Sequence, residues 1–132
     1  MVQIIQFPKI LDRRGNLSFF ESSNHVPFDI KRTYWIYDVP GGETRGGHAY
    51  KSLQEIVIAL SGSFDVHVES KAGSEVYSLN RSYNALYLPA GTWRSLQNFS
   101  TNAVCLVAAS EVYDESDYIR DYDQFKSFIT HG

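Results

Sequence analysis

Short runs of β-forming residues, separated by turn residues at close spacing, constrain the fold of this chain more than any other feature. The turns at 61–63 (Ser-Gly-Ser) and 71–74 (Lys-Ala-Gly-Ser) interrupt apolar runs, and between them Phe64, Val66 and Val68 alternate with polar residues. About ten short strands at this spacing are typical of a sandwich or barrel, so the predicted fold class is all-β. In this half of the chain the predicted strands cover residues 53–60, 64–69, 75–79, 85–88, 93–98 and 103–108.

The first third of the chain contains three further predicted strands. Residues 2–7 and 16–22 are rich in β-forming residues and are separated by the turn signal 12–15 (Asp-Arg-Arg-Gly). Residues 29–37 alternate, so that Tyr34 shares one face with Ile30, Arg32 and Ile36 while Tyr37 shares the other with Lys31, Thr33 and Trp35. Residues 42–47 contain so many glycines that we expect an irregular segment there.

After Ser110 the apolar residues change to helical spacing. Tyr118, Tyr122, Phe125 and Ile129 recur on one helical face, with acidic residues near the start of the segment. We therefore predict a short C-terminal helix packed against the strands.

Length and composition limit the classes of function. The 132 residues fit one domain, which we predict to span residues 1–132. A formal charge of −3 and the lack of a Lys/Arg run argue against nucleic acid or an anionic membrane as partners. The single cysteine, Cys105, excludes an intrachain disulfide and is predicted to be buried. The sequence has no run long enough to span a membrane and no signal-peptide pattern, so we expect a cytoplasmic protein.

Residues 42–62 resemble the first signature of the cupin family. That signature reads Gly, five residues, His-x-His, three or four residues, Glu, six residues, Gly. The chain matches it at Gly42, His48, Glu55 and Gly62, and it has Tyr50 in place of the second histidine.

Residues 89–98 resemble the second cupin signature, which reads Pro-x-Gly, two residues, His, three residues, Asn. The matches are Pro89, Gly91 and Asn98, and Arg94 stands in place of the histidine. The two resemblances imply a cupin-type jelly-roll β-barrel, here followed by the short C-terminal helix.

The two departures argue against a metal site. A cupin metal site takes four protein ligands, of which this chain keeps His48 and Glu55. Arg94 offers only hydrogen-bond donors, and its positive charge opposes a cation directly. We therefore predict neither a metal nor another cofactor, and a pocket suited to proton transfer and anion binding.

Beyond the cupin signatures, the chain resembles the sugar-nucleotide 3,4-ketoisomerases of the WxcM-like family. The family's activity implies an isomerase that moves the keto group of dTDP-4-keto-6-deoxy-D-glucose from C4 to C3, in the biosynthesis of 3-amino-3,6-dideoxy sugars. The resemblance also implies this dTDP-linked sugar as the partner, and a homodimer. The matching segments are Asp12-x-Arg14-Gly15-x-Leu17, PFDIKRTYWIYD (27–38), RGGHAYKSLQ (45–54), LSGS (60–63), LPAGTW (88–93) and AASEVYDESDYIRDYDQF (108–125).

The resemblance assigns roles to single residues. It places the catalytic base on His48, with Tyr34 and Tyr50 as further catalytic residues; Tyr50 stands where many members have a second histidine. Imidazole suits this chemistry because its ordinary pKa near 6.5 lets it accept and return a proton near neutral pH. The substrate-binding residues that we predict are Arg14, Arg32, Arg45, Arg94, Tyr37 and Glu55.

Two other functions stay open at this point. A non-catalytic cupin that binds sugar nucleotides would use nearly the same pocket, so only turnover separates it from the isomerase. A metal-dependent dioxygenase is disfavoured by the missing ligands, and metal analysis of the purified protein would test it.

Overall fold

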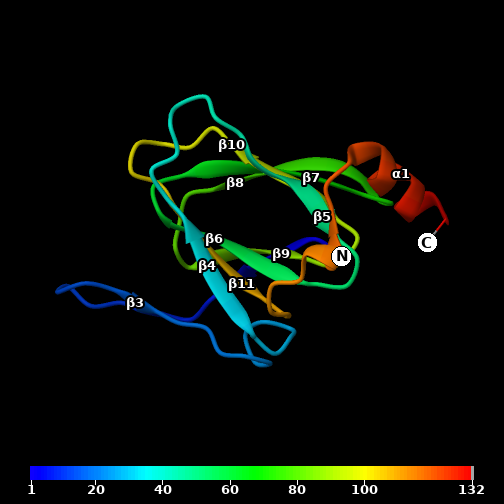
Figure 1. Ribbon diagram of the computed structural model, residues 1–132. Helices are drawn as coiled ribbons and strands as arrows, with labels where there is room; N and C mark the ends of the chain where they lie inside the picture. The colour runs from blue at the N-terminus through cyan, green and yellow to red at the C-terminus, as the bar shows by residue number, and fades with distance from the viewer. Residues whose placement is uncertain (132) are drawn as a thin grey trace.

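Eight strands, β4 to β11, form two facing antiparallel sheets that further elements extend (Figure 1). The computed structural model describes residues 1–131. Sheet 1 has the strand order β1-β9-β6-β11-β4, and sheet 2 has the order β12-β5-β10-β7-β8. The elements are β1 (Gln3–Gln6), β2 (Lys9–Ile10), β3 (Leu17–Ser18), β4 (Arg32–Ile36), β5 (Arg45–Tyr50), β6 (Glu55–Ser61), β7 (Phe64–Ser70), β8 (Gly73–Leu79), β9 (Asn84–Leu88), β10 (Trp93–Gln97), β11 (Val104–Ala109), the 3-10 turn η1 (Glu115–Asp117), β12 (Tyr118–Ile119) and α1 (Tyr122–His131).

The strand pairs of the two sheets are nested. β7 and β8 form a hairpin, and around it β6 pairs with β9, β5 with β10, and β4 with β11, each pair antiparallel. Successive pairs alternate between the two sheets, as in one long hairpin rolled into a jelly roll. The predicted jelly roll with a short C-terminal helix is therefore confirmed. Within residues 1–131 its barrel consists of two separate sheets and not of one continuous closed sheet.

The core lies between the two sheets, and it explains which residues along each strand are apolar. Val66 on β7 and Val57 on β6 point into this space and are fully buried. On the outer face of sheet 1, Ile56 and Ile58 pack against Phe28 and other residues of the N-terminal segment. Because both faces of β6 are covered, residues 56–59 are apolar without alternation. Cys105 on β11 is buried, as predicted.

The two predicted N-terminal strands, 2–7 and 16–22, do not pair with each other. β1 pairs with β9 and forms one edge of sheet 1, and only Leu17–Ser18 of the predicted strand 16–22 is a strand. The turn at 12–15 connects a much shorter hairpin, β2–β3, with Ile10 opposite Leu17. This hairpin projects from the body of the protein and exposes Ile10, Leu11 and Leu17 (Figure 1).

The prediction of an irregular segment at 42–47 is wrong from Arg45 onward. β5 begins at Arg45 and pairs with β10, with His48 opposite Arg94. Gly46 has a φ of +72°, and a Cβ at this position would collide with the side chain of Arg94. The glycine is therefore required by the close approach of an arginine and does not interrupt the strand.

The tail is extended before it becomes helical. Asp114 caps η1 by accepting a hydrogen bond from the Ser116 amide, and Asp117 accepts bonds from the amides of Ser52 and Leu53. These contacts hold Tyr118 in β12, so its predicted place on the helical face is wrong, and α1 begins only at Tyr122. Among residues 1–131 no helix has the length and apolar character needed to cross a membrane.

Candidate active site

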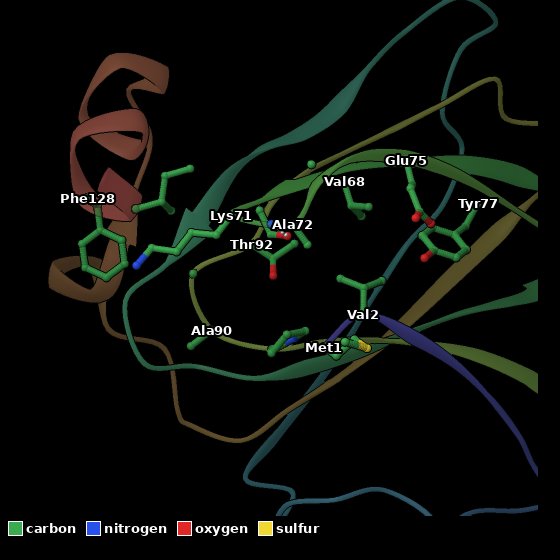
Figure 2. A pocket seen from close by; sticks show the side chains of 15 residues that line it. Met1, Val2, Val68, Lys71, Ala72, Glu75, Tyr77, Ala90, Thr92 and Phe128 are labelled. Atoms are coloured by element: carbon green, nitrogen blue, oxygen red, sulfur yellow. Dashed lines mark hydrogen bonds between the residues drawn. The ribbon is translucent and has the colours of Figure 1, made fainter. Parts of the chain in front are cut away.

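Two cavities open between the sheets, and they differ in chemistry. The larger, about 600 Å³, lies beside β1 and β8 and has mainly apolar walls, with Lys71, Glu75 and Thr92 among its polar members (Figure 2). The other, about 470 Å³, lies beside β4, β5 and β12. Only the second brings a histidine together with tyrosines and arginines, so we take it as the candidate active site. Its chemically active lining residues are His48, Tyr34, Tyr50, Tyr113, Tyr118, Arg32, Arg45, Arg94 and Arg120.

His48 is the histidine that lines this cavity. It lies on β5, only 7% exposed, and its Nε2 is 3.1 Å from the hydroxyl oxygen of Tyr50. Burial, and then the positive charge of Arg94, lower the pKa of His48 to about 3. The imidazole is therefore neutral near pH 7 and able to accept a proton.

Behind His48 lies a buried ion pair. Arg94 Nε donates to Glu55 Oε1 at 2.7 Å and Nη2 donates to Oε2 at 3.2 Å, with both side chains 2% exposed. Nη1 donates to the carbonyl oxygen of Gly46. Burial opposes the charge of Arg94, but the Glu55 carboxylate outweighs it and raises the pKa of the guanidinium. At the floor of the cavity, Arg94 and Glu55 thus balance each other's charge and hydrogen-bond each other.

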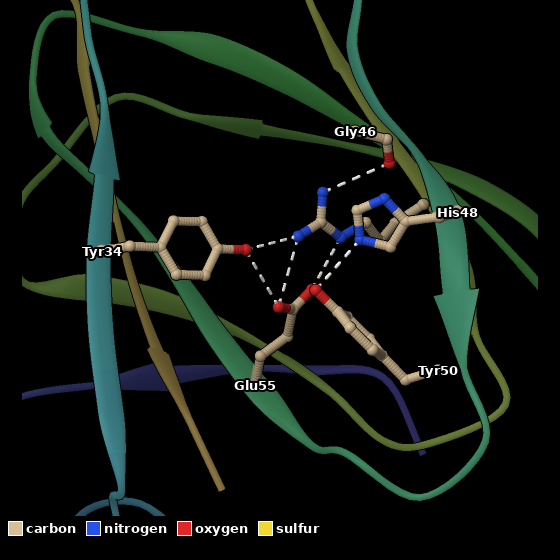
Figure 3. A network of polar contacts seen from close by, with 6 residues as sticks. Tyr34, Gly46, His48, Tyr50 and Glu55 are labelled. Atoms are coloured by element: carbon tan, nitrogen blue, oxygen red, sulfur yellow. Dashed lines mark hydrogen bonds and ion pairs between the residues drawn. The ribbon is translucent and has the colours of Figure 1, made fainter. Parts of the chain in front are cut away.

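Tyr34 joins this ion pair from β4, which lies in the same sheet as Glu55 and faces the sheet that carries Arg94. Figure 3 shows it reaching from β4 toward the side chains of β5 and β6. Its hydroxyl accepts a bond from Arg94 Nη2 at 2.8 Å and donates to Glu55 Oε2 at the long distance of 3.5 Å. Burial, and then the Glu55 carboxylate, raise the pKa of Tyr34 to about 12, so the phenol stays protonated.

Tyr50 and Tyr118 form the wall beside the imidazole. The two residues are paired across β5 and β12, and their ring centroids are 4.7 Å apart. The ring of Tyr118 also lies 5.0 Å from that of His48. Burial, and then the charge of Glu55, raise the pKa of Tyr50, so this phenol is also neutral at rest.

The tail contributes residues that the sequence prediction did not include. Arg120 binds Glu115 through two hydrogen bonds of 2.7 and 2.9 Å and lies 4.1 Å above the ring of Tyr118. Tyr113 donates to the same carboxylate at 2.6 Å. The unusual order of Tyr, Asp and Arg residues in 108–125 was the available signal for these positions.

The predicted arginines occupy different environments. Arg32 is half-buried, with its guanidinium 4.9 Å from the ring of Tyr34 and 5.7 Å from that of Tyr113. Arg45 is exposed at the cavity. Arg14 lies far from both, in the projecting hairpin, where it pairs with Asp12.

Tyr37 also lies outside the candidate site. Its side chain is on the outer face of sheet 1, where it lines a separate apolar hollow with Trp35, Leu60 and Leu106. Of the nine predicted site residues, the structure therefore gathers His48, Tyr34, Tyr50, Glu55, Arg94, Arg32 and Arg45, and leaves Arg14 and Tyr37 apart.

The side chains of the cavity are poorly suited to ligate a metal ion. Across residues 1–131 no three His, Cys, Asp or Glu side chains come together as a metal site would require. Here His48 and Glu55 have a guanidinium beside them, which repels a cation. The residues present do not fit a metal centre.

Comparison with known proteins decides the family. The family model described as WxcM-like, C-terminal (FdtA) matches residues 1–130. The chain belongs to the WxcM-like family. This agrees with the resemblance of the tail and of the two modified cupin signatures.

WxcM-like relatives match the chain over nearly its whole length. The TDP-4-oxo-6-deoxy-alpha-D-glucose-3,4-oxoisomerase of Aneurinibacillus thermoaerophilus is 40% identical over 127 residues, which cover 96% of this chain and 91% of that protein. A histidine-to-asparagine mutant of the 3,4-ketoisomerase QdtA from Thermoanaerobacterium thermosaccharolyticum, solved in complex with TDP-4-keto-6-deoxyglucose, is 37% identical. It covers 98% of this chain and 94% of its own, with a TM-score of 0.95.

A more distant structure shares the fold alone. The dTDP-4-dehydrorhamnose 3,5-epimerase of Bacillus anthracis is 16% identical, with a TM-score of 0.76, and covers 89% of this chain and 76% of its own.

Proposed function

We propose that this protein is a sugar-nucleotide 3,4-ketoisomerase that converts dTDP-4-keto-6-deoxy-D-glucose into the 3-keto isomer. One observation carries the proposal: a buried, neutral histidine contacts a buried phenol in a cavity lined by tyrosines and arginines. The names of the relatives support the reaction and the substrate. The product belongs to the biosynthesis of 3-amino-3,6-dideoxy sugars, as the sequence resemblance implies.

His48 is the proposed base of this reaction. The isomerisation removes a proton from C3 and returns one to C4, and a single imidazole placed between the carbons can do both. Its low pKa keeps it unprotonated in the resting enzyme.

The negative charge of the enediolate must be stabilised by hydrogen-bond donors and positive charge that are already held in place. Arg94 is proposed to supply positive charge beside the enediolate. Tyr34 is proposed to donate to it once the phenol proton turns away from Glu55 Oε2, which lies at the long distance of 3.5 Å. Glu55 holds the Arg94 guanidinium in place. A low-dielectric, preorganised group of this kind stabilises a developing anion more than water does.

The diphosphate is proposed to bind at the cavity mouth. Arg45 is exposed there, and Arg32 has a buried Nε without a hydrogen-bond partner in the described chain. Guanidinium groups suit phosphate oxygens because they bind two of them at once. Arg14 could join this site only if the projecting hairpin moved or belonged to another subunit.

A homodimer is the proposed assembly. β1 leaves an unpaired edge on sheet 1, and Trp35, Tyr37 and Leu60 expose an apolar surface on its outer face. Such an edge and patch favour contact with a second copy. One domain spanning residues 1–132 and a cytoplasmic location also remain proposals.

The proposed reaction is tested by incubating the protein with dTDP-4-keto-6-deoxyglucose in deuterated water and following the sugar ring by NMR. We expect the 3-keto product and solvent deuterium at C3 or C4. His48→Asn should reduce turnover by roughly two to four orders of magnitude, because the positioned base is lost. His67→Asn, on the outer face of sheet 2, is the matched control and should leave turnover unchanged.

Three results would contradict the proposal. Substrate binding without turnover by the wild type would identify a non-catalytic binding protein. Near wild-type turnover by His48→Asn would remove His48 as the base. A stoichiometric metal in active protein would require a different mechanism.

A further inference from the structure

The isomerisation moves two kinds of proton, one between carbons and one between oxygens. When C3 loses its proton, the C4 carbonyl becomes an oxyanion and must gain a proton, while the C3 hydroxyl must lose one before it can become a carbonyl. A base that serves the two carbons does not by itself carry out the oxygen transfer. The cavity must therefore contain a second group for it.

We propose that Tyr50 carries the proton that moves between the two substrate oxygens, while His48 carries the proton that moves between the two carbons. This inference rests on the proposed function and assigns separate chemical tasks to two residues in contact. A phenol is suited to the task because one hydroxyl donates and accepts at the same time.

The steps balance as follows. His48 takes the proton from C3, the C–H electrons form the C3–C4 double bond, and the carbonyl electrons move onto O4, which takes the Tyr50 proton. The C3 hydroxyl then returns a proton to the Tyr50 oxygen, the C3 carbonyl forms, and C4 takes the proton from His48. Both residues end in their starting states, and no oxidant or reductant is consumed.

The hydrogen bonds favour Tyr50 over Tyr34 for this role. The hydroxyl of Tyr34 is engaged at both ends, because it accepts from Arg94 and donates toward Glu55. The hydroxyl of Tyr50 lies 3.1 Å from His48 Nε2, and within the described chain it makes no hydrogen bond to the Arg94–Glu55 ion pair, so it can also contact a substrate oxygen. Both tyrosines line the cavity, but the Tyr34 oxygen already accepts a hydrogen bond from Arg94 and is less suited to take the proton of the C3 hydroxyl.

The contact with His48 links the two transfers. Burial makes an isolated Tyr50 phenolate costly, which is why its pKa is raised. Once His48 has taken the carbon proton, however, the imidazole is a cation 3.1 Å from the phenol oxygen. The cation stabilises the phenolate at the stage when Tyr50 has given its proton to O4. Tyr50 therefore becomes a usable acid only after His48 has acted.

Strand β12 holds this pair in place. Tyr118 on β12 is paired with Tyr50 on β5, and its ring contacts the rings of both His48 and Tyr50. The carboxylate of Asp117 fixes the start of β12 to the turn after β5. Tyr118 is thus a positioning residue for the two proton carriers.

The test measures two rates in Tyr50→Phe, the exchange of the substrate C3 proton with solvent and the formation of the 3-keto product. In deuterated water, the variant should still exchange the C3 proton of dTDP-4-keto-6-deoxyglucose, within about tenfold of the wild-type rate, because His48 remains. Formation of the 3-keto product should fall by roughly 100-fold or more, since the oxygen proton has no carrier. His48→Asn should lose both exchange and product. Tyr83→Phe, which lies outside the candidate site and next to Lys9, is the matched control and should change neither rate.

Other outcomes overturn the inference. Near wild-type product formation by Tyr50→Phe shows that another group carries the oxygen proton. Equal loss of exchange and product, in a variant that still binds dTDP, shows that Tyr50 only supports His48. Tyr50→His should restore product formation, because imidazole also gives and accepts protons; a fully inactive but folded Tyr50→His contradicts the assignment. If the wild type itself yields no product, the proposed function fails first.

Discussion

Breaking the Arg94–Glu55 ion pair should destabilise the protein strongly. Arg94→Met keeps much of the aliphatic volume but leaves the Glu55 carboxylate buried with no cation beside it. The two side chains are each 2% exposed and are joined by hydrogen bonds of 2.7 and 3.2 Å. Removing one partner from such a pair costs about 3–5 kcal/mol, and the lost bonds to Tyr34 and Gly46 add to this cost.

Urea denaturation of three variants at neutral pH measures the effect. Arg94→Met should lose about 3–5 kcal/mol of unfolding free energy. The double variant Arg94→Met/Glu55→Gln should be more stable than Arg94→Met, since the unpaired charge is gone. Arg120→Met, which breaks the exposed pair with Glu115, is the control and should cost about 1 kcal/mol or less.

Two results would refute the reasoning. A loss below about 1 kcal/mol in Arg94→Met would mean that Glu55 finds water or another partner. A double variant no more stable than Arg94→Met would mean that the cost does not come from the uncompensated carboxylate.

Four further predictions address pH, the tail, anion binding and assembly. The pKa of His48 is about 3 in the folded protein and near 6.5 in the unfolded chain, so between these pH values the unfolded chain binds more protons. The unfolding free energy should therefore fall as the pH decreases from 6.5 to 3, by up to roughly 4 kcal/mol. His48→Asn should flatten this slope in denaturation measured from pH 7 to pH 3. Asp117→Ala removes three hydrogen bonds to Ser52 and Leu53, so it should lower the unfolding free energy by about 2 kcal/mol and reduce isomerase activity, as measured by denaturation and turnover. The affinity for dTDP, measured by calorimetry, should weaken with added salt, and Arg45→Lys should weaken it further because a bidentate contact to phosphate is lost. An affinity that does not depend on salt would contradict arginine contacts to the diphosphate. Light scattering should show a dimer at micromolar concentration that Trp35→Glu dissociates, and a wild-type monomer would exclude the proposed assembly.

The sequence predicted most strands because their burial alternates locally. Phe64, Val66 and Val68 face the core while their neighbours face outward, and this pattern is visible without a structure. β5 and β12 were missed because their cause lies elsewhere in the chain. β5 has glycine at position 46 because the Arg94 side chain needs the space. β12 is extended because the Asp117 carboxylate is hydrogen-bonded to the amides of residues 52 and 53.

The sequence predicted which residues lie together where a signature fixed their spacing. His48, Tyr50, Glu55 and Arg94 occupy signature positions and meet in the structure. The alternation along 29–37 already places Tyr37 on the opposite face from Tyr34, and in the structure Tyr37 lies apart from the cavity of His48.

Tyr118 and Arg120 required the fold. They reach the cavity because β12 pairs with β5. The order of residues in the tail marks these positions but does not predict that pairing.

The nested strand pairs also set an order of assembly during folding. The innermost pair, β7–β8, joins residues as close as Ser70 and Gly73, whereas the outermost, β4–β11, brings Arg32 to Ala109. Chain closure costs more entropy for the distant pair, so local hairpins form early and the outer strands join late. Tyr34 lies on an outer strand and His48 on the next one inward. A partly folded chain therefore contains the hairpin core but no proton-transfer site, and activity should return during refolding only with the last and slowest phase of strand pairing.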